Sequence, residues 1–226
     1  MKRYLPFVIV AGVALVALGS GAILYRAKRQ QQQLWPIPEN KAISGTTDAE
    51  SLHIRGNPDA PVTLEEFGDF QCPPCSSFAT FGEKLLEEYD SRLRIVFRNF
   101  PLQAHEHARE AALAAEAAGF QGKFWEMHDM LYQEQAFWSY VPNARELFES
   151  YAEKIGLNLD QFKKDIDSEK VRERVDSDRA LGDFLGVKLT PTLFINHQPV
   201  EPKDKTPEGV RAAINAALAP KSKSGT

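Results

Sequence analysis

The sequence predicts an α/β domain that begins with a strand, a helix and a second strand and ends with a strand pair and a helix. Residues 62–67 and 94–100 are short runs with many β-branched and aromatic side chains, as expected of strands. Residues 73–89 have the apolar spacing of a helix. This connection is long enough for a crossover between parallel strands.

The composition is that of a globular protein, with 43% hydrophobic and 26% charged residues in a chain of 226. A core can therefore form without disulfides or structural metal. The net charge of -4 argues against binding to nucleic acid, which selects basic surfaces. The two cysteines stand three positions apart, so a disulfide between them closes almost no loop and stabilises little. We expect them to have a chemical role.

The N-terminus has the pattern of a membrane anchor. Residues 4–25 carry no charge and are long enough, at ~1.5 Å per residue, to cross a hydrocarbon core of ~30 Å. Basic residues flank this run on both sides. We expect a single transmembrane signal anchor; a cleaved signal peptide, with Ser20-Gly21-Ala22 as its small-residue site, is the alternative.

Four parts of the chain are therefore expected. They are the anchor at 1–29, a polar, proline-containing linker at 30–50, a folded domain at 51–219, and a tail at 220–226. The charges on the two sides of the anchor do not decide its orientation. If the cysteines oxidise other proteins, we expect the folded domain to lie outside the cytoplasm.

The first predicted strand follows the turn residues 56–61, and Pro101 ends the second strand. A helical insertion is expected at about residues 103–185. Its predicted helices are at residues 107–118, 123–133, 143–155, 159–166 and 169–185.

A further strand is predicted at 187–195, and residues 196–199 turn the chain into a short second strand. Thr206 is a suitable N-cap and Pro207 a suitable first residue for a final helix that ends near residue 218.

The motif Cys72-Pro73-Pro74-Cys75 lies where the first strand passes into its helix. Free N–H groups and the helix dipole at this end favour a thiolate at Cys72. Cys75 lies one turn further on the same helix face, where the two sulfurs can meet. Pro74 offers neither an N–H nor a charge. We therefore expect the pKa of Cys72 to be lowered, but not to the ~3.5 of the strongest oxidants.

Other uses of the cysteine pair compete with redox chemistry. It could be half of a zinc site, with His105 and His107 as the further ligands, or it could deliver copper. A purely structural disulfide is the third alternative. We assign no metal ligand.

Three segments resemble the DsbA-like family of thiol–disulfide oxidoreductases in the thioredoxin superfamily, and most closely its membrane-anchored bacterial forms. They are residues 67–75 (Phe-Gly-Asp-Phe-Gln-Cys-Pro-Pro-Cys), residues 98–102 and residues 186–196, within a match that spans about 52–218. The resemblance implies a thioredoxin fold, in which helices flank a central mixed sheet, split by a helical insertion.

The resemblance also implies roles for individual residues. Cys72 would be the attacking cysteine and Cys75 the buried one. Pro191 would follow a cis peptide bond beside them, and Thr190 would offer backbone hydrogen bonds to an extended substrate. No histidine stands in the Pro73-Pro74 dipeptide, unlike in strongly oxidising members, so the direction of catalysis stays open.

Glu66 is the remaining candidate site residue. It stands six positions before Cys72, where thioredoxin-fold proteins often keep a buried acid, and alternation places it on the strand face shared by Val62 and Leu64. There it could exchange a proton with Cys75. The alternative is that Glu66 only caps an element or pairs with a Lys or Arg.

The leading hypothesis is a dithiol oxidase at the bacterial cytoplasmic membrane, with its catalytic domain outside the cytoplasm. It would donate its Cys72–Cys75 disulfide to exported proteins, would need no other cofactor, and would be reoxidised by a DsbB- or VKOR-like membrane partner. Alternatives are a reductase or isomerase fed by a membrane reductant, a copper- or zinc-binding assembly factor, and a tethered chaperone-like binder.

Overall fold

The structure is a computed structural model that describes residues 53–220. The predicted anchor at 1–29 and linker at 30–50 lie outside the described residues. Within residues 53–220, no helix is both long and apolar enough to cross a membrane.

A central mixed sheet is present, as predicted, and has the strand order β1-β3-β2-β4-β5. The strands are β1 (His53–Gly56), β2 (Val62–Gly68), β3 (Leu93–Asn99), β4 (Thr192–Ile195) and β5 (Gln198–Pro199). β2 and β3 are parallel and are joined by the predicted crossover helix, whereas the other pairs are antiparallel. In this register Leu64 of β2 lies between Ile95 of β3 and Ile195 of β4.

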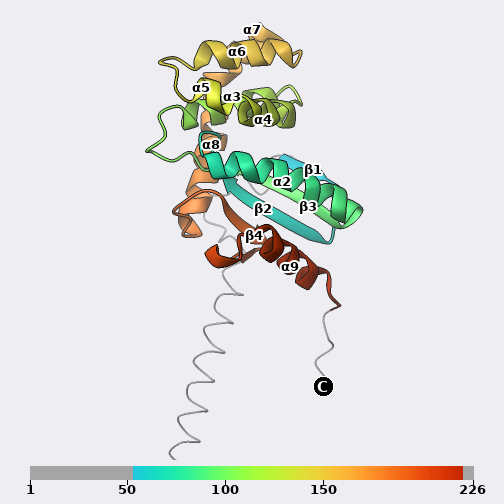
Figure 1. The fold of residues 1–226 in the computed structure, drawn as a ribbon. Coiled ribbons are helices and arrows are strands. Elements are labelled where there is room, and N and C mark those ends of the chain that lie inside the picture. The colour runs from blue at the N-terminus through green and yellow to red at the C-terminus, as the bar shows by residue number, and fades with distance from the viewer. Residues whose placement is uncertain (1–52, 221–226) are drawn as a thin grey trace, which may run out of the picture. The chain divides into compact units, whose positions relative to one another are not determined.

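Helices cover the sheet and fill the connection from β3 to β4. The crossover helix is α2 (Pro73–Tyr89), which the short 3-10 turn η2 (Asp90–Arg92) joins to β3, and the turn η3 (Pro202–Asp204) leads into the C-terminal helix α9 (Pro207–Leu218). The insertion consists of α3 (Ala108–Gly119), α4 (Phe124–Gln133), α5 (Gln135–Trp138), α6 (Arg145–Lys154), α7 (Leu159–Ile166) and α8 (Glu169–Phe184). In Figure 1 the helices α3, α4, α6 and α7 stack together at the end of the domain opposite α9.

Both faces of the sheet are buried. Val62 and Leu64 belong to one apolar cluster with Leu85 of α2 and Val210 of α9. On the opposite face α8 packs so closely that a Cβ atom on Gly182 would lie 2.6 Å from the ring of Phe100. β2 is therefore buried on both sides, which is why its sequence does not alternate between apolar and polar residues.

Three details differ from the sequence-based expectations. The strand predicted at 187–195 is confined to Thr192–Ile195, because Pro191 has no N–H for the sheet and the residues before it form a bend. β1 was not predicted, since four residues at a sheet edge give too short a pattern. The four-residue helix α5 was missed for the same reason.

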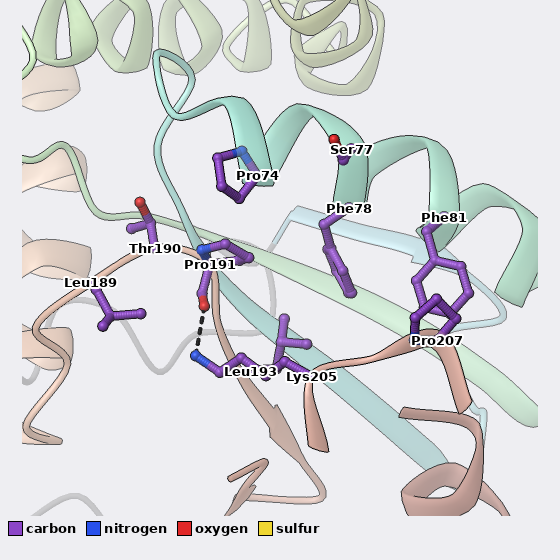
Figure 2. A pocket seen from close by; sticks show the side chains of 10 residues that line it. All are labelled: Pro74, Ser77, Phe78, Phe81, Leu189, Thr190, Pro191, Leu193, Lys205 and Pro207. Atoms are coloured by element: carbon purple, nitrogen blue, oxygen red, sulfur yellow. Dashed lines mark hydrogen bonds between the residues drawn. The ribbon is translucent and has the colours of Figure 1, made fainter. Parts of the chain in front are cut away.

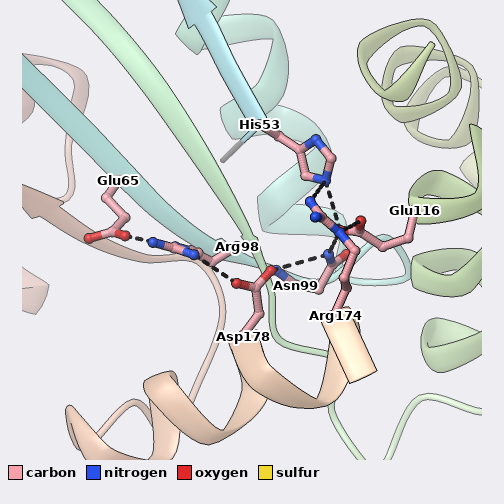
Figure 3. Close-up of polar contacts among 7 residues, drawn as sticks. All are labelled: His53, Glu65, Arg98, Asn99, Glu116, Arg174 and Asp178. Carbon is pink, nitrogen blue, oxygen red and sulfur yellow. Dashed lines mark hydrogen bonds and ion pairs between the residues drawn. The ribbon is translucent and has the colours of Figure 1, made fainter. Parts of the chain in front are cut away.

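A chain of polar contacts joins the insertion to the sheet (Figure 3). Arg98 of β3 donates to Glu65 of β2 at 2.9 Å and to Asp178 of α8 at 3.0 Å. Asp178 also accepts the backbone N–H of Asn99 at 2.9 Å. Because these groups are buried, each partner satisfies a charge that would be costly alone.

Glu116 of α3 extends this chain to the other side of the insertion. Its carboxylate contacts the side chains of Asn99 at 2.6 Å, Arg174 of α8 at 2.6 Å and His53 of β1 at 2.9 Å. The contacts with His53 and Arg174 keep the pKa of Glu116 below its usual value although burial opposes ionisation. The network thereby fixes α3 and α8 against the central strands.

The close approach of α8 to the sheet can be tested at Gly182. Alanine is the better helix former by about 1 kcal/mol. Gly182→Ala should nevertheless lower the free energy of unfolding by about 1–3 kcal/mol, because its methyl group would overlap Phe100 and Phe67. The measurement is denaturant unfolding of the domain at residues 51–219. Ala180→Gly, at an exposed position of α8, is the control for propensity alone; stabilisation by Gly182→Ala would contradict the packing described.

Candidate active site

The two cysteines lie at the junction of β2 and α2. Cys72 is the N-cap of α2, with φ -83° and ψ 116°, and prolines occupy the start of the helix. The N–H of Cys72 donates to the carbonyl of Asp69 at 3.1 Å, and the N–H of Cys75 donates to the carbonyl of Cys72 at 3.0 Å. Prolines suit this first turn because its N–H groups have no helical partner. The local sequence thus places both sulfurs at the positive end of α2.

Both cysteines are free thiols, but their environments push their pKa values in opposite directions. The pKa of Cys72 is lowered to about 6, chiefly by a hydrogen bond from the thiol of Cys75, with smaller contributions from Thr190 and from the backbone of Cys75. Burial and the nearby Asp69 carboxylate act against this lowering. Cys72 therefore carries substantial thiolate at neutral pH, the form that attacks disulfides.

Cys75 is completely buried, and its pKa is raised, first by burial and then by its hydrogen bond to Cys72. The negative charges of Glu66 and Cys72 add to this increase. Cys75 therefore remains a thiol while Cys72 ionises. This asymmetry gives the two sulfurs different chemical roles.

The segment before β4 meets the cysteine pair. Sγ of Cys72 lies 3.4 Å from the carbonyl oxygen of Thr190, although 118 residues separate them. The Thr190–Pro191 peptide bond is cis, as the resemblance implied. The two residues named as substrate-binding candidates thus lie beside the reactive sulfur.

Glu66 is buried in β2, with 2% of its surface exposed. It lines a small cavity together with Phe78 and Ala79 of α2, which places it on the α2 side of the sheet. Burial raises its pKa well above the usual value, and the charge of Cys72 raises it further. Among the described residues Glu66 forms no ion pair, and its Oε1 has no hydrogen-bond partner. Of these two adjacent glutamates, it is Glu65 that pairs with an arginine, Arg98.

Sequence reasoning missed Asp69, whose buried carboxylate organises the loop before Cys72. It accepts the backbone N–H groups of Gln71 at 2.7 Å and Leu102 at 2.8 Å, and it contacts Nδ1 of His105 at 2.8 Å. An Asp two positions before the N–H that it accepts is a known turn signal, so the contact to Gln71 was available from the sequence. The contacts to Leu102 and His105 were not.

Gln135 of α5 was also missed. Its side-chain amide donates to the carbonyl oxygens of Phe70 at 2.6 Å and Cys72 at 3.2 Å. The insertion therefore helps to hold the loop that carries Cys72. No local pattern marks Gln135, because its role depends on tertiary packing.

The two histidines considered as zinc ligands have other partners. Nδ1 of His105 contacts Asp69, and Nε2 of His107 lies 2.7 Å from the carbonyl oxygen of Val141. No group of three or more metal-ligating side chains occurs within residues 53–220.

Comparison with known proteins supplies the family. A family model described as Thioredoxin matches residues 48–216. Among curated proteins, the Na(+)/H(+) antiporter NhaA 1 of Mycolicibacterium gilvum is 39% identical over 166 residues, which cover 71% of this chain and 26% of that protein. The chain spans about a quarter to a third of the length of such antiporter relatives, so their name describes much longer proteins.

Solved structures share the fold over most of their length. BdbD from Bacillus subtilis, in its oxidised form, has a TM-score of 0.66 at 24% identity, covering 75% of this chain and 94% of that one. A thioredoxin-like oxidoreductase from Silicibacter pomeroyi has a TM-score of 0.63 at 26% identity, covering 76% and 94%. The thiol–disulfide exchange protein alpha-DsbA2 from Wolbachia pipientis has a TM-score of 0.63 at 20% identity. The match covers 79% of this chain and 95% of that one. The chain thus belongs to the thioredoxin family, and its described part has the fold of the DsbA-type thiol–disulfide oxidoreductases.

Proposed function

We propose that this protein is a thiol–disulfide oxidoreductase that oxidises pairs of thiols in exported proteins through Cys72 and Cys75. The observation that supports it best is the asymmetry of the pair. The pKa of Cys72 is lowered to about 6 at the helix start, whereas burial raises that of Cys75. Such a pair forms a mixed disulfide at one defined sulfur and resolves it with the other.

The reaction begins with the Cys72–Cys75 disulfide. A client thiolate attacks Sγ of Cys72, the bond between the two protein sulfurs breaks, and Cys75 departs as a thiolate that takes up a proton. A second client thiolate then attacks the client sulfur of the mixed disulfide, and Cys72 departs as a thiolate. The client loses two electrons and two thiol protons, and the protein gains the two electrons.

The low pKa of Cys72 favours this direction. A thiol that ionises easily is a good leaving group, so the second step is fast, and a stabilised Cys72 thiolate favours the reduced form of the protein. Both effects drive the disulfide from the protein to the client.

Glu66 is proposed as the proton donor to Cys75. Burial raises the pKa of its carboxyl well above the usual value, so it holds its proton to higher pH than an exposed glutamate does, and it is electrostatically coupled to Cys75. When Cys75 leaves as a buried thiolate, Glu66 can supply the proton, and in the reverse direction it can accept one.

Reoxidation requires a partner that accepts two electrons from the Cys72–Cys75 dithiol. We propose a DsbB- or VKOR-like membrane oxidase, and a position on the outer side of a bacterial cytoplasmic membrane, held there by the apolar N-terminal run. The sequence supports this through the uncharged residues 4–25 and through its single pair of cysteines. A tethered reductase or isomerase is the second candidate, favoured by the Asp69 carboxylate, which opposes the Cys72 thiolate.

Trapping of clients tests the proposed function directly. Cys75→Ser should accumulate mixed disulfides between Cys72 and exported proteins, since the resolving sulfur is gone. Cys72→Ser, the matched control, should accumulate almost none, because Cys75 is buried and its pKa is raised. The measurement is non-reducing electrophoresis with mass spectrometry of the linked peptides. Equal trapping by both variants, or by neither, would contradict the assigned roles.

The Cys72 thiol should titrate with a midpoint near pH 6. In the reduced protein the rate of alkylation at Cys72 should rise as the pH rises through this midpoint and then level off. Cys75→Ala should move the midpoint upward, because the thiol that donates to the Cys72 thiolate is lost. A wild-type midpoint at the ordinary ~8.5 would contradict the electrostatics described.

Glu66→Gln should slow oxidation of a dithiol peptide about tenfold or more, because the buried proton donor is lost. The pH–rate profile should also lose the ionisation that belongs to Glu66. Glu65→Gln is the matched control on the opposite face of β2, where the side chain pairs with Arg98. An unchanged pH–rate profile in Glu66→Gln would show that Glu66 has no part in proton transfer.

A further inference from the structure

A groove of about 410 Å³ lies beside the cysteine pair (Figure 2). Phe78 and Phe81 line it from α2, and Leu189 and Pro191 line it from the segment that leads into β4. Thr190, whose carbonyl oxygen contacts Sγ of Cys72, is also part of its wall. The groove therefore lies next to the sulfur to which a client would be joined.

The groove contains one charged side chain. Of the ten residues that line it, Lys205 alone carries a charge. Its Nζ donates to the carbonyl oxygen of Pro191 at 2.8 Å and lies 3.5 Å from Oγ1 of Thr192 (Figure 2). Among the described residues the lysines that form ion pairs are Lys123 and Lys163. Lys205 thus has neutral oxygen partners and no carboxylate.

This arrangement is suited to an anion. An ammonium group has three N–H donors, and the two oxygens near Lys205 leave a third available. Partial burial lowers the pKa of Lys205, and the charge of Cys75 acts against this lowering. A carboxylate placed at the third donor would form a charge-assisted hydrogen bond and offset that desolvation.

The geometry also indicates how a carboxylate of the client could reach Lys205. A client joined to Cys72 through its own cysteine must run past Thr190 and the groove wall. Main-chain contacts along such an extended segment accept any sequence, whereas pockets for individual side chains give selectivity. In an extended segment every second side chain points to the same side, so a neighbour of the client cysteine can enter the groove.

We propose that Lys205 makes the binding of a client segment in this groove selective for a carboxylate beside an apolar side chain. The proposal rests on the proposed function, because it assigns a substrate preference to the same site. It makes Lys205 a specificity-determining residue.

The test uses Cys75→Ser, which keeps Cys72 as the only thiol, and a set of short peptides with one cysteine beside a leucine. A single glutamate is placed in turn at each of the three positions before and the three positions after the cysteine, and the leucine takes the other flank. A second set carries glutamine in place of each glutamate. The protein is first joined to glutathione. Each peptide thiol then displaces glutathione from Cys72, and mass spectrometry gives the equilibrium constant of the exchange.

For at least one position the glutamate peptide should be favoured over its glutamine partner by about three- to tenfold. Adding Lys205→Gln should abolish this ratio, and adding Lys205→Arg should retain most of it. Lys203→Gln, at an exposed site in the turn η3 just before Lys205, is the control and should leave the ratio unchanged. A change in the reactivity of Cys72 itself would affect both peptides equally and would not alter the ratio.

Two results would overturn the proposal while leaving the proposed function in place. One is efficient exchange with every peptide but no preference for glutamate at any position. The other is a preference that persists in Lys205→Gln, which would assign it to another group. If none of the peptides forms a mixed disulfide with Cys72, the proposed function itself fails.

Discussion

The contact between Cys72 and Thr190 is the constraint on which the rest of the site depends. Sγ of Cys72 lies 3.4 Å from the carbonyl oxygen of a residue 118 positions away. The helix start supplies positive potential and the segment before β4 brings Thr190 to the sulfur, and together with the Cys75 thiol they lower the pKa of Cys72. The same segment forms one wall of the groove that holds Lys205. Reactivity and client binding therefore share one junction.

The fold holds this junction by burying both faces of the central sheet. β2 carries Glu66 toward α2 and Glu65 toward α8, so one strand supplies a candidate proton donor on one face and a structural ion pair on the other. The network through Arg98, Asp178 and Glu116 fixes the insertion against the sheet. Gln135 of that insertion then holds the carbonyl of Cys72. The insertion thus acts on the active site through direct contacts.

Much of the fold and part of the site could be predicted because their signals are local. The crossover helix α2, the N-cap Thr206 with its bond to Gly209, and the position of Cys72 at a helix start all follow from residues within one or two turns. The family resemblance placed Thr190 and Pro191 beside the cysteines, which periodicity alone could not do.

The remaining features depend on contacts between distant segments. The contact of Asp69 with His105 and that of Lys205 with Pro191 join residues whose positions in the sequence give no sign that they meet. Alternation placed Glu65 and Glu66 on opposite faces of β2, but it could not show that Glu65 is the one that pairs with Arg98. Such features become visible only when the sheet and its covering helices are in place.

The central claim is that the environment of Cys72 makes the cysteine pair an oxidant of other proteins. The reduction potential of the Cys72–Cys75 pair, measured by equilibrating the domain at residues 51–219 with glutathione, tests this claim most directly. The account predicts a value between the ~-180 mV of protein disulfide isomerase and the ~-120 mV of DsbA. A value near ~-270 mV, that of thioredoxin, would contradict it and would indicate a reductase.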